Sequence, residues 1–247
     1  MRLLLVTGTG EELRALRGLL SLQFDRSRGL YLSLKSASLF ALSAGAGLSR
    51  RRLLRRALRE LKPDIVVNAG LVGLLRLDDP RPVGERLALR SVLESESGLV
   101  YPGGPGRDTL VSVGSPVFEP WEKDELALRF KATACEMEAA PLLALLGRTE
   151  EVAESVTVIF VKVIGDRPES YDLFRYEHLV RGWYRDSLWE RIRTGFLFPG
   201  GPLRLRRLLG QKAEGLDGLR RAVGGLLPGI LSGRAKTGSI DSVFIPH

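Results

Sequence analysis

The sequence predicts an α/β protein in which helices pack on a mixed or parallel β-sheet. Apolar runs typical of buried strands alternate with segments whose apolar residues recur every three or four positions, as on one face of a helix. The clearest strands are MRLLLVTG (1–8), KPDIVVNAG (62–70) and VTVIFVKVIGD (156–166). With 247 residues, 44% of them hydrophobic, the chain is long enough for a large core. We therefore expect a single domain over residues 1–247.

Each further element follows from a local signal. Helices are predicted where apolar residues have helical spacing, and strands where apolar runs are bounded by glycine, proline or polar residues. In order, these elements are a helix over 11–20, two short strands on either side of Ser36 to Ser38, a helix over 49–61, strands over 62–70, 86–95 and 109–117, a helix over 121–130, a short strand leading into a helix after Met137, and the strand over 156–166. Small residues predict a loop at AGLVG (69–73), and glycines and prolines predict one at YPGGPGRD (101–108). The pattern beyond residue 170 predicts a helical C-terminal extension over 171–232, then a tail or short edge strand.

Composition excludes several classes of protein. The net charge of +8 comes largely from arginines interleaved with leucines at helical spacing, as in 49–61, which is typical of amphipathic helices with solvated basic faces. No nucleic-acid-binding motif accompanies them, so we expect no nucleic-acid partner. We expect neither a membrane span nor a secretory signal, and therefore a cytoplasmic protein. One cysteine and two histidines leave little to bind a metal, and we expect no metal and no cofactor.

Carboxyl groups follow two of the predicted elements. Glu138 is expected to open a helix and Asp166 to end a buried strand, so residues far apart in sequence can meet at one edge of the sheet. Open α/β sheets bind ligands at that edge. Each acid also has a purely structural interpretation, because Asp166 can cap a helix that starts near Pro168 and Glu138 can be a first-turn acid. Met137 can equally be core filling, and Cys135 is expected to be a buried small hydrophobe.

Five segments, taken in order, resemble the nucleoside phosphorylase and nucleosidase superfamily, which includes methylthioadenosine/S-adenosylhomocysteine nucleosidase and futalosine hydrolase. They are the first strand and its turn with Glu12, the Gly45-Ala46-Gly47 turn, KPDIVVNAGLVGLL (62–75), Met137-Glu138, and Ile164-Gly165-Asp166. The resemblance covers roughly residues 1 to 170. It implies a three-layer αβα sandwich with a central mixed β-sheet, here with an extended C-terminal helical region.

The resemblance also implies a role for each matched residue. Glu12 would position or deprotonate the attacking water, although Glu11 beside it leaves that assignment ambiguous. Asp166 would protonate the leaving base. Glu138 would accept hydrogen bonds from the ribose hydroxyls, and Met137 would pack beneath the sugar. Gly45, Gly47, Ala69 and Gly70 would form the loops around the nucleophile.

The nucleophile can be inferred from what the glycine segments lack. The phosphorylases of this superfamily hold phosphate with arginines in the first glycine turn and just before the second glycine loop. Here VTGTGEEL (6–13) and VVNAGLVG (66–73) contain no arginine, so water is the expected nucleophile. Phosphorolysis stays open, because Arg14, Arg50 or Arg76 can reach in from neighbouring turns. A catalytically inactive nucleoside-binding or membrane-surface module is the reading from another class.

Two departures from the family pattern concern the substrate. Leu71 stands where the nucleosidases have serine or isoleucine, and Gly165 replaces a serine. The aromatic residue that stacks on the base has no clear counterpart, and the candidates are Phe118, Trp121 and Phe130. We expect a purine-type nucleoside as substrate and a homodimer or higher homo-oligomer.

Overall fold

The computed structural model describes residues 1–117, 120–149, 156–168, 201–232 and 242–244, and it has an α/β fold built on a mixed sheet. The strands are β1 (Leu3–Thr7), β2 (Leu22–Asp25), β3 (Leu30–Ser33), β4 (Leu39–Ser43), β5 (Ile65–Leu74), β6 (Leu89–Glu94), β7 (Val100–Pro102), β8 (Asp108–Ser112), β9 (Ala134–Glu136), β10 (Thr157–Asp166) and β11 (Ser242–Phe244). The helices are α1 (Gly10–Arg17), the 3-10 turn η1 (Ala46–Leu48), α2 (Arg51–Leu61), α3 (Pro120–Phe130), α4 (Ala139–Gly147) and α8 (Gly201–Leu231).

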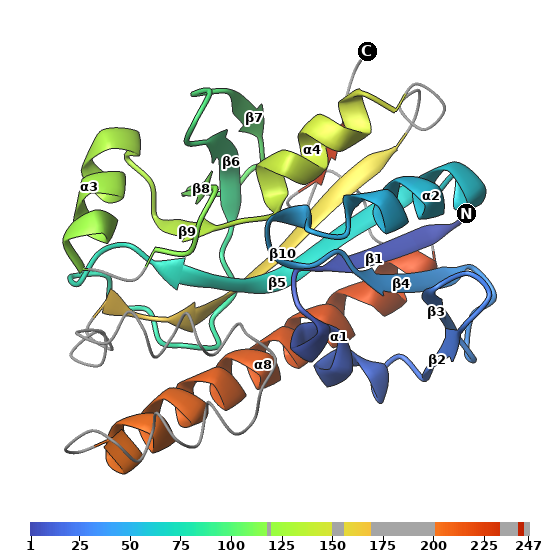
Figure 1. Ribbon diagram of the computed structural model, residues 1–247, viewed down its shortest axis with the longest axis horizontal. Helices are drawn as coiled ribbons and strands as arrows, with labels where there is room; N and C mark the ends of the chain where they lie inside the picture. The colour runs from blue at the N-terminus through green and yellow to red at the C-terminus, as the bar shows by residue number, and fades with distance from the viewer. Residues whose placement is uncertain (118–119, 150–155, 169–200, 233–241, 245–247) are drawn as a thin grey trace.

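Helices cover both faces of the sheet (Figure 1). Alternate residues of β1 belong to different cores, because successive side chains of a strand point to opposite faces. Leu4 and Val6 pack with α2 and α4, whereas Leu3 and Leu5 pack with α1 and α8. These two cores make a three-layer αβα sandwich, which confirms the predicted fold class, including a helix in the C-terminal region.

The central strand β5 changes partner along one edge. Its first half pairs in parallel with β1, ending with Thr7 opposite Ala69, and its last residues pair antiparallel with β9 at Gly73 and Leu74. On the other edge it pairs with β10 in parallel. The carboxyl ends of β1 and β9 therefore face each other across an opening beside the middle of β5.

Three details differ from the sequence-based prediction. The predicted loop at 69–73 is wrong, because β5 continues to Leu74 where β10 and β9 supply backbone partners for its small residues. Strand β2 was not predicted, and it pairs antiparallel with β3 at the edge of the sheet. Strand β7 lies at the start of the predicted loop over 101–108 and pairs with β6. Of the predicted extension over 171–232, the described part is the helix α8, and residues 171–200 lie outside the described ranges.

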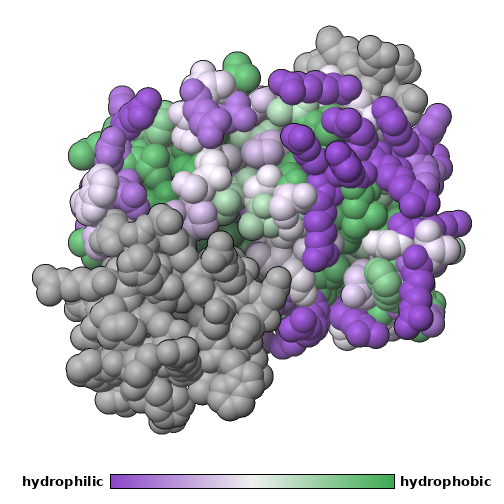
Figure 2. Space-filling model, in the orientation of Figure 1, coloured by the Kyte–Doolittle hydropathy of each residue, from purple (hydrophilic) through white to green (hydrophobic). Residues whose placement is uncertain are grey.

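The surface over α2 is strongly basic. Arg51, Arg52, Arg55, Arg56 and Arg59 are exposed, and Figure 2 shows hydrophilic residues gathered over this helix. Its opposite face buries leucines in the core, as the predicted amphipathic pattern requires. Within the described ranges, no helix is long and apolar enough to cross a membrane. No group of three histidine, cysteine or acidic side chains is placed to hold a metal ion in that part of the chain.

Candidate functional site

Glu12 enters the opening beside β5 because of how α1 begins. Thr9 caps the helix: its hydroxyl accepts a hydrogen bond from the Glu12 amide, and the Glu12 carboxylate accepts one from the Thr9 amide. The other carboxylate oxygen accepts the amide of Leu71, at 2.7 Å, in the middle of β5. Glu11 turns away and forms an ion pair with Lys212 of α8. The geometry thus distinguishes two neighbouring glutamates that the sequence leaves ambiguous, and Glu12 is the one inside.

Glu138 reaches the same opening from the start of α4. Its carboxylate accepts the amide of Gly47 at 3.2 Å and lies so close to Gly8 that a Cβ atom there would be 2.9 Å from Oε1. Gly47 has a φ of 58°, the left-handed region that favours glycine, and a Cβ there would meet the Met137 methyl group at 3.5 Å. The structure therefore brings Gly47, Met137 and Glu138 together, and Gly70 lies beside Glu12. Ala69 is fully buried one residue before Gly70.

A third glutamate and a lysine complete this group, and neither was predicted. Glu136, in β9, is buried, and its carboxylate accepts hydrogen bonds from the Lys162 ammonium at 2.8 Å and from the Ser112 hydroxyl. It also accepts the amides of Glu138 and Ala139, which fixes the backbone at the start of α4. Lys162 lies in β10 and is 1% exposed. We call Glu12, Glu136, Glu138 and Lys162 the carboxylate cluster.

Burial and mutual repulsion shift the pKa values of this cluster. Burial raises the pKa of Glu138 to about 8, and the neighbouring charges of Glu136 and Glu12 contribute. Burial also raises the pKa of Glu12, although the amides of Leu71 and Thr9 partly offset it. Burial acts on Glu136 in the same sense, but Lys162 overcomes it, so the pKa of Glu136 lies below its usual value. Glu136 is therefore the anion of the cluster, while Glu12 and Glu138 are poised to exchange protons nearer neutral pH.

Asp166 lies farther along β5, beside Gly73, and not within the carboxylate cluster. Its carboxylate accepts a hydrogen bond from the Lys123 ammonium of α3 at 2.8 Å, and a Cβ atom on Gly73 would come within 3 Å of both groups. The Asp166 side chain is 43% exposed and that of Lys123 is 1% exposed. A buried cation thus lies behind a carboxylate that is partly exposed. The neighbouring Arg167 donates to the carbonyls of Arg81 and Asp79, which anchors this end of β10.

Comparison with known proteins gives structural neighbours only. No protein-family model matches the sequence, and no curated protein matches it either. Among solved structures, an Arabidopsis thaliana 5′-methylthioadenosine nucleosidase aligns with a TM-score of 0.60 and 15% identity over 91% of this chain and 95% of that one. The chain has the nucleosidase fold. A Helicobacter pylori 5′-methylthioadenosine/S-adenosylhomocysteine nucleosidase aligns at 0.60 and 13% identity, over 92% and 99% of the two chains. The futalosine hydrolase of the same organism aligns at 0.58 and 13%, over 92% and 98%.

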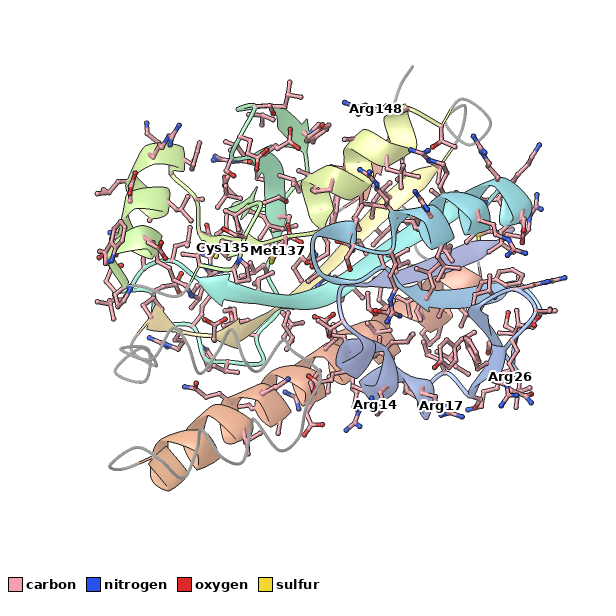
Figure 3. The ribbon with its side chains drawn as sticks, viewed as in Figure 1. Arg14, Arg17, Arg26, Cys135, Met137 and Arg148 are labelled. Carbon is pink, nitrogen blue, oxygen red and sulfur yellow. The ribbon has the colours of Figure 1, made fainter. Side chains whose placement is uncertain are left out.

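The three arginines considered as phosphate ligands, Arg14, Arg50 and Arg76, are all exposed. Arg76 forms an exposed ion pair with Asp78. Figure 3 shows Arg14 on the outer side of α1, well away from Met137. The buried cations that contact the acids described above are lysines.

Among the described residues, the structure assigns no stacking role to an aromatic candidate. Phe118 lies outside the described residues, so its predicted stacking role stays a prediction. Trp121 is 62% exposed, and Phe130 packs in a small core with Cys135. Burial raises the pKa of Cys135 to about 11, so its thiol is protonated at neutral pH.

The missed residues differ in how visible they were. Lys162 interrupts an otherwise apolar strand, and a charge in that position requires a buried partner, so the sequence contained its signal. Glu136 stands two residues before Glu138, but the family resemblance pointed only to Met137 and Glu138. Lys123 lies among charged residues in WEKDELALRF (121–130), and nothing in that pattern distinguishes it from a surface lysine.

Proposed function

We propose that the protein is a nucleosidase that hydrolyses the N-glycosidic bond of a purine-type nucleoside, releasing the free base and a ribosyl product. One observation carries the proposal: Glu12 and Glu138, from distant parts of the sequence, converge on the end of β1 and the middle of β5. Asp166, the last residue of β10, lies opposite Gly73 farther along β5. The neighbours with this fold support it, since all three named above are nucleosidases or hydrolases.

The reaction requires different catalytic groups at the ribose and at the leaving base. As the bond between C1′ and the base nitrogen breaks, its electron pair moves to the base and positive charge develops on the ribose. Carboxylates beside the sugar stabilise that charge, and a proton donor beside the base stabilises the leaving group. The carboxylate cluster suits the sugar, and Asp166 suits the base.

At the sugar end, the two active glutamates divide the work. Glu138 lies against Gly8, Gly47 and Met137, where its carboxyl oxygens accept hydrogen bonds from ribose hydroxyls. Glu12 accepts a proton from water as the water oxygen bonds to C1′. A general base works best when its pKa is near the working pH, and burial moves the pKa of Glu12 in that direction.

Phosphorolysis is the alternative reaction, and one experiment separates the two. The protein is incubated with adenosine, inosine and 5′-methylthioadenosine, with and without inorganic phosphate, and the products are separated chromatographically. We expect free base and free ribosyl sugar at a rate independent of phosphate. Ribose 1-phosphate formed only with phosphate would establish a phosphorylase. Tight nucleoside binding without turnover would establish an inactive binding module and contradict the proposal.

The identity of the base, the group at the ribose 5′ position, the homo-oligomer and the cytoplasmic location stay predictions. The Helicobacter pylori nucleosidase is complexed with a compound bearing a 4-amino-5H-pyrrolo[3,2-d]pyrimidin-7-yl group. That compound supports including an aminopurine among the first substrates to be tried.

A further inference from the structure

Lys123 occupies an unusual position for a lysine. It is the fully buried residue of α3, whereas Trp121 and Leu128 of the same helix are 62% and 79% exposed. Burying an ammonium group costs several kcal/mol unless it is paired. Its partner is Asp166, whose side chain remains 43% exposed. The helix therefore places a cation behind an acid that faces outward, at the expense of the usual apolar packing.

Room for this pair is built into β5. A Cβ atom on Gly73 would lie 2.7 Å from the Lys123 nitrogen and 2.9 Å from an Asp166 oxygen, so only glycine fits there without displacing them. Gly70, three residues earlier, leaves similar space for Glu12. At about 3.3 Å per residue, the two glycines are roughly 10 Å apart along β5.

The two groups differ in charge balance. In the carboxylate cluster three carboxyl groups lie around Lys162, whereas beside Gly73 the Asp166 carboxylate is paired with the Lys123 ammonium. Charge separation during glycosidic cleavage has the same direction, since the ribose becomes positive and the base gains electrons. A carboxylate beside the base repels the negative charge that the base gains. The pairing of Asp166 with Lys123 reduces that repulsion.

We propose that Lys123 is a positioning residue for the departure of the base, acting through Asp166. This inference rests on the proposed function. The exposed Asp166 carboxylate first takes a proton from solvent. When it passes that proton to a ring nitrogen, the O–H bond breaks, an N–H bond forms, and the electron pair of the C1′–N bond stays with the base. Asp166 is then a carboxylate, and the Lys123 ammonium stabilises it by the hydrogen bond seen in the structure. Lys123 also holds one carboxylate oxygen of Asp166 in place.

A double-mutant cycle tests whether Lys123 acts through Asp166. The variants are Lys123→Met, Asp166→Asn and the double variant, with Lys123→Arg as the control that keeps the charge. We expect Lys123→Met to lower kcat for purine nucleoside hydrolysis by about 10- to 100-fold, the size of a lost hydrogen bond to a charged group. In the Asp166→Asn background the same change should cost less than about threefold. Lys123→Arg should retain more activity than Lys123→Met.

A second substrate separates leaving-group chemistry from a loss of structure. The 4-nitrophenyl riboside releases a phenolate that needs little protonation, so Lys123→Met should slow its hydrolysis far less than that of the purine nucleoside. Removing one partner of a buried ion pair destabilises a protein, less so here because Asp166 is 43% exposed, and thermal unfolding measures that loss directly. Equal losses with both substrates, or losses that multiply in the double variant, would overturn the inference while leaving the nucleosidase intact. No turnover by the unsubstituted protein would instead contradict the proposed function and, with it, this inference.

Discussion

The Cβ atom of Leu71 lies 2.8 Å from the position that a Cβ atom would take on Gly165. Real Cβ atoms do not approach side-chain carbons this closely, so leucine at 71 requires glycine at 165 on the neighbouring strand β10. Both positions depart from the nucleosidase pattern, which has serine at the second of them. In this structure the side chain at 71 thus leaves room only for glycine at 165, next to Asp166.

This relationship predicts strong coupling between the two positions. Gly165→Ser should destabilise the protein by about 1–3 kcal/mol, the usual cost of overpacking. In a Leu71→Gly background the same serine has room, and the cost should largely disappear. Urea unfolding of both single variants and the double variant measures this, and additive free energies would show that the two side chains do not compete.

Glu138 predicts a pH dependence of stability. Its pKa is about 8 in the folded protein and near 4.5 when unfolded, so the folded state keeps a proton that the unfolded state loses between these values. The free energy of unfolding should therefore fall as pH rises from about 4.5 to 8. Glu138→Gln carries no titrating group and should weaken this fall, which urea unfolding at pH 5 and pH 8 will show. Identical pH slopes in both proteins would contradict the shifted pKa.

Glu12 and Glu11 form a natural pair of test and control. Glu12→Gln should lower kcat by about 10²- to 10⁴-fold, because a general base is lost. Glutamine also serves at this position of a capping box, so the start of α1 should be retained. Glu11→Gln removes only the ion pair with Lys212 and should leave kcat within about twofold. Comparable losses in the two variants would refute the assignment of Glu12.

The Glu136–Lys162 pair predicts a stability effect of another size. Lys162→Met leaves the buried Glu136 carboxylate without its cation and should cost about 3–5 kcal/mol of unfolding free energy. Glu136→Gln combined with Lys162→Met removes both charges and should recover much of that loss. Denaturant unfolding of the single and double variants provides the measurement. A double variant less stable than Lys162→Met alone would argue against the buried pair.

Gly73 predicts a loss of activity from a single methyl group. Gly73→Ala places a Cβ atom against Lys123 and Asp166 and should lower kcat for a purine nucleoside by at least about tenfold. Gly225→Ala is the matched control: it lies in α8 with no atom within 4 Å of the new Cβ, and alanine there should stabilise the helix by up to about 1 kcal/mol. Steady-state kinetics and thermal unfolding of the two variants distinguish a local from a general effect.

The sequence predicted what depends on periodicity and on short motifs. The strands β1, β5 and β10 and the helix after Met137 follow from apolar spacing. Element ends suggested that Glu138 and Asp166 meet at one sheet edge, whereas Glu12 was assigned only from the family resemblance. What it could not predict depends on contacts between distant segments. The extension of β5 through its glycines required β9 and β10 as partners, and the burial of Lys123 required the approach of α3 to Asp166.

Glu12 has one carboxylate oxygen on the Thr9 amide and the other on the Leu71 amide, so the same side chain closes the first turn of α1 and ties it to the middle of the sheet. The carboxylate cluster cannot be assembled without α1, because Glu12 belongs to that helix. Hydrogen exchange at the Thr9 and Leu71 amides should therefore proceed through one shared opening event, and Glu12→Ala should accelerate both. In that sense the cooperative unit that protects these amides from solvent also assembles the site.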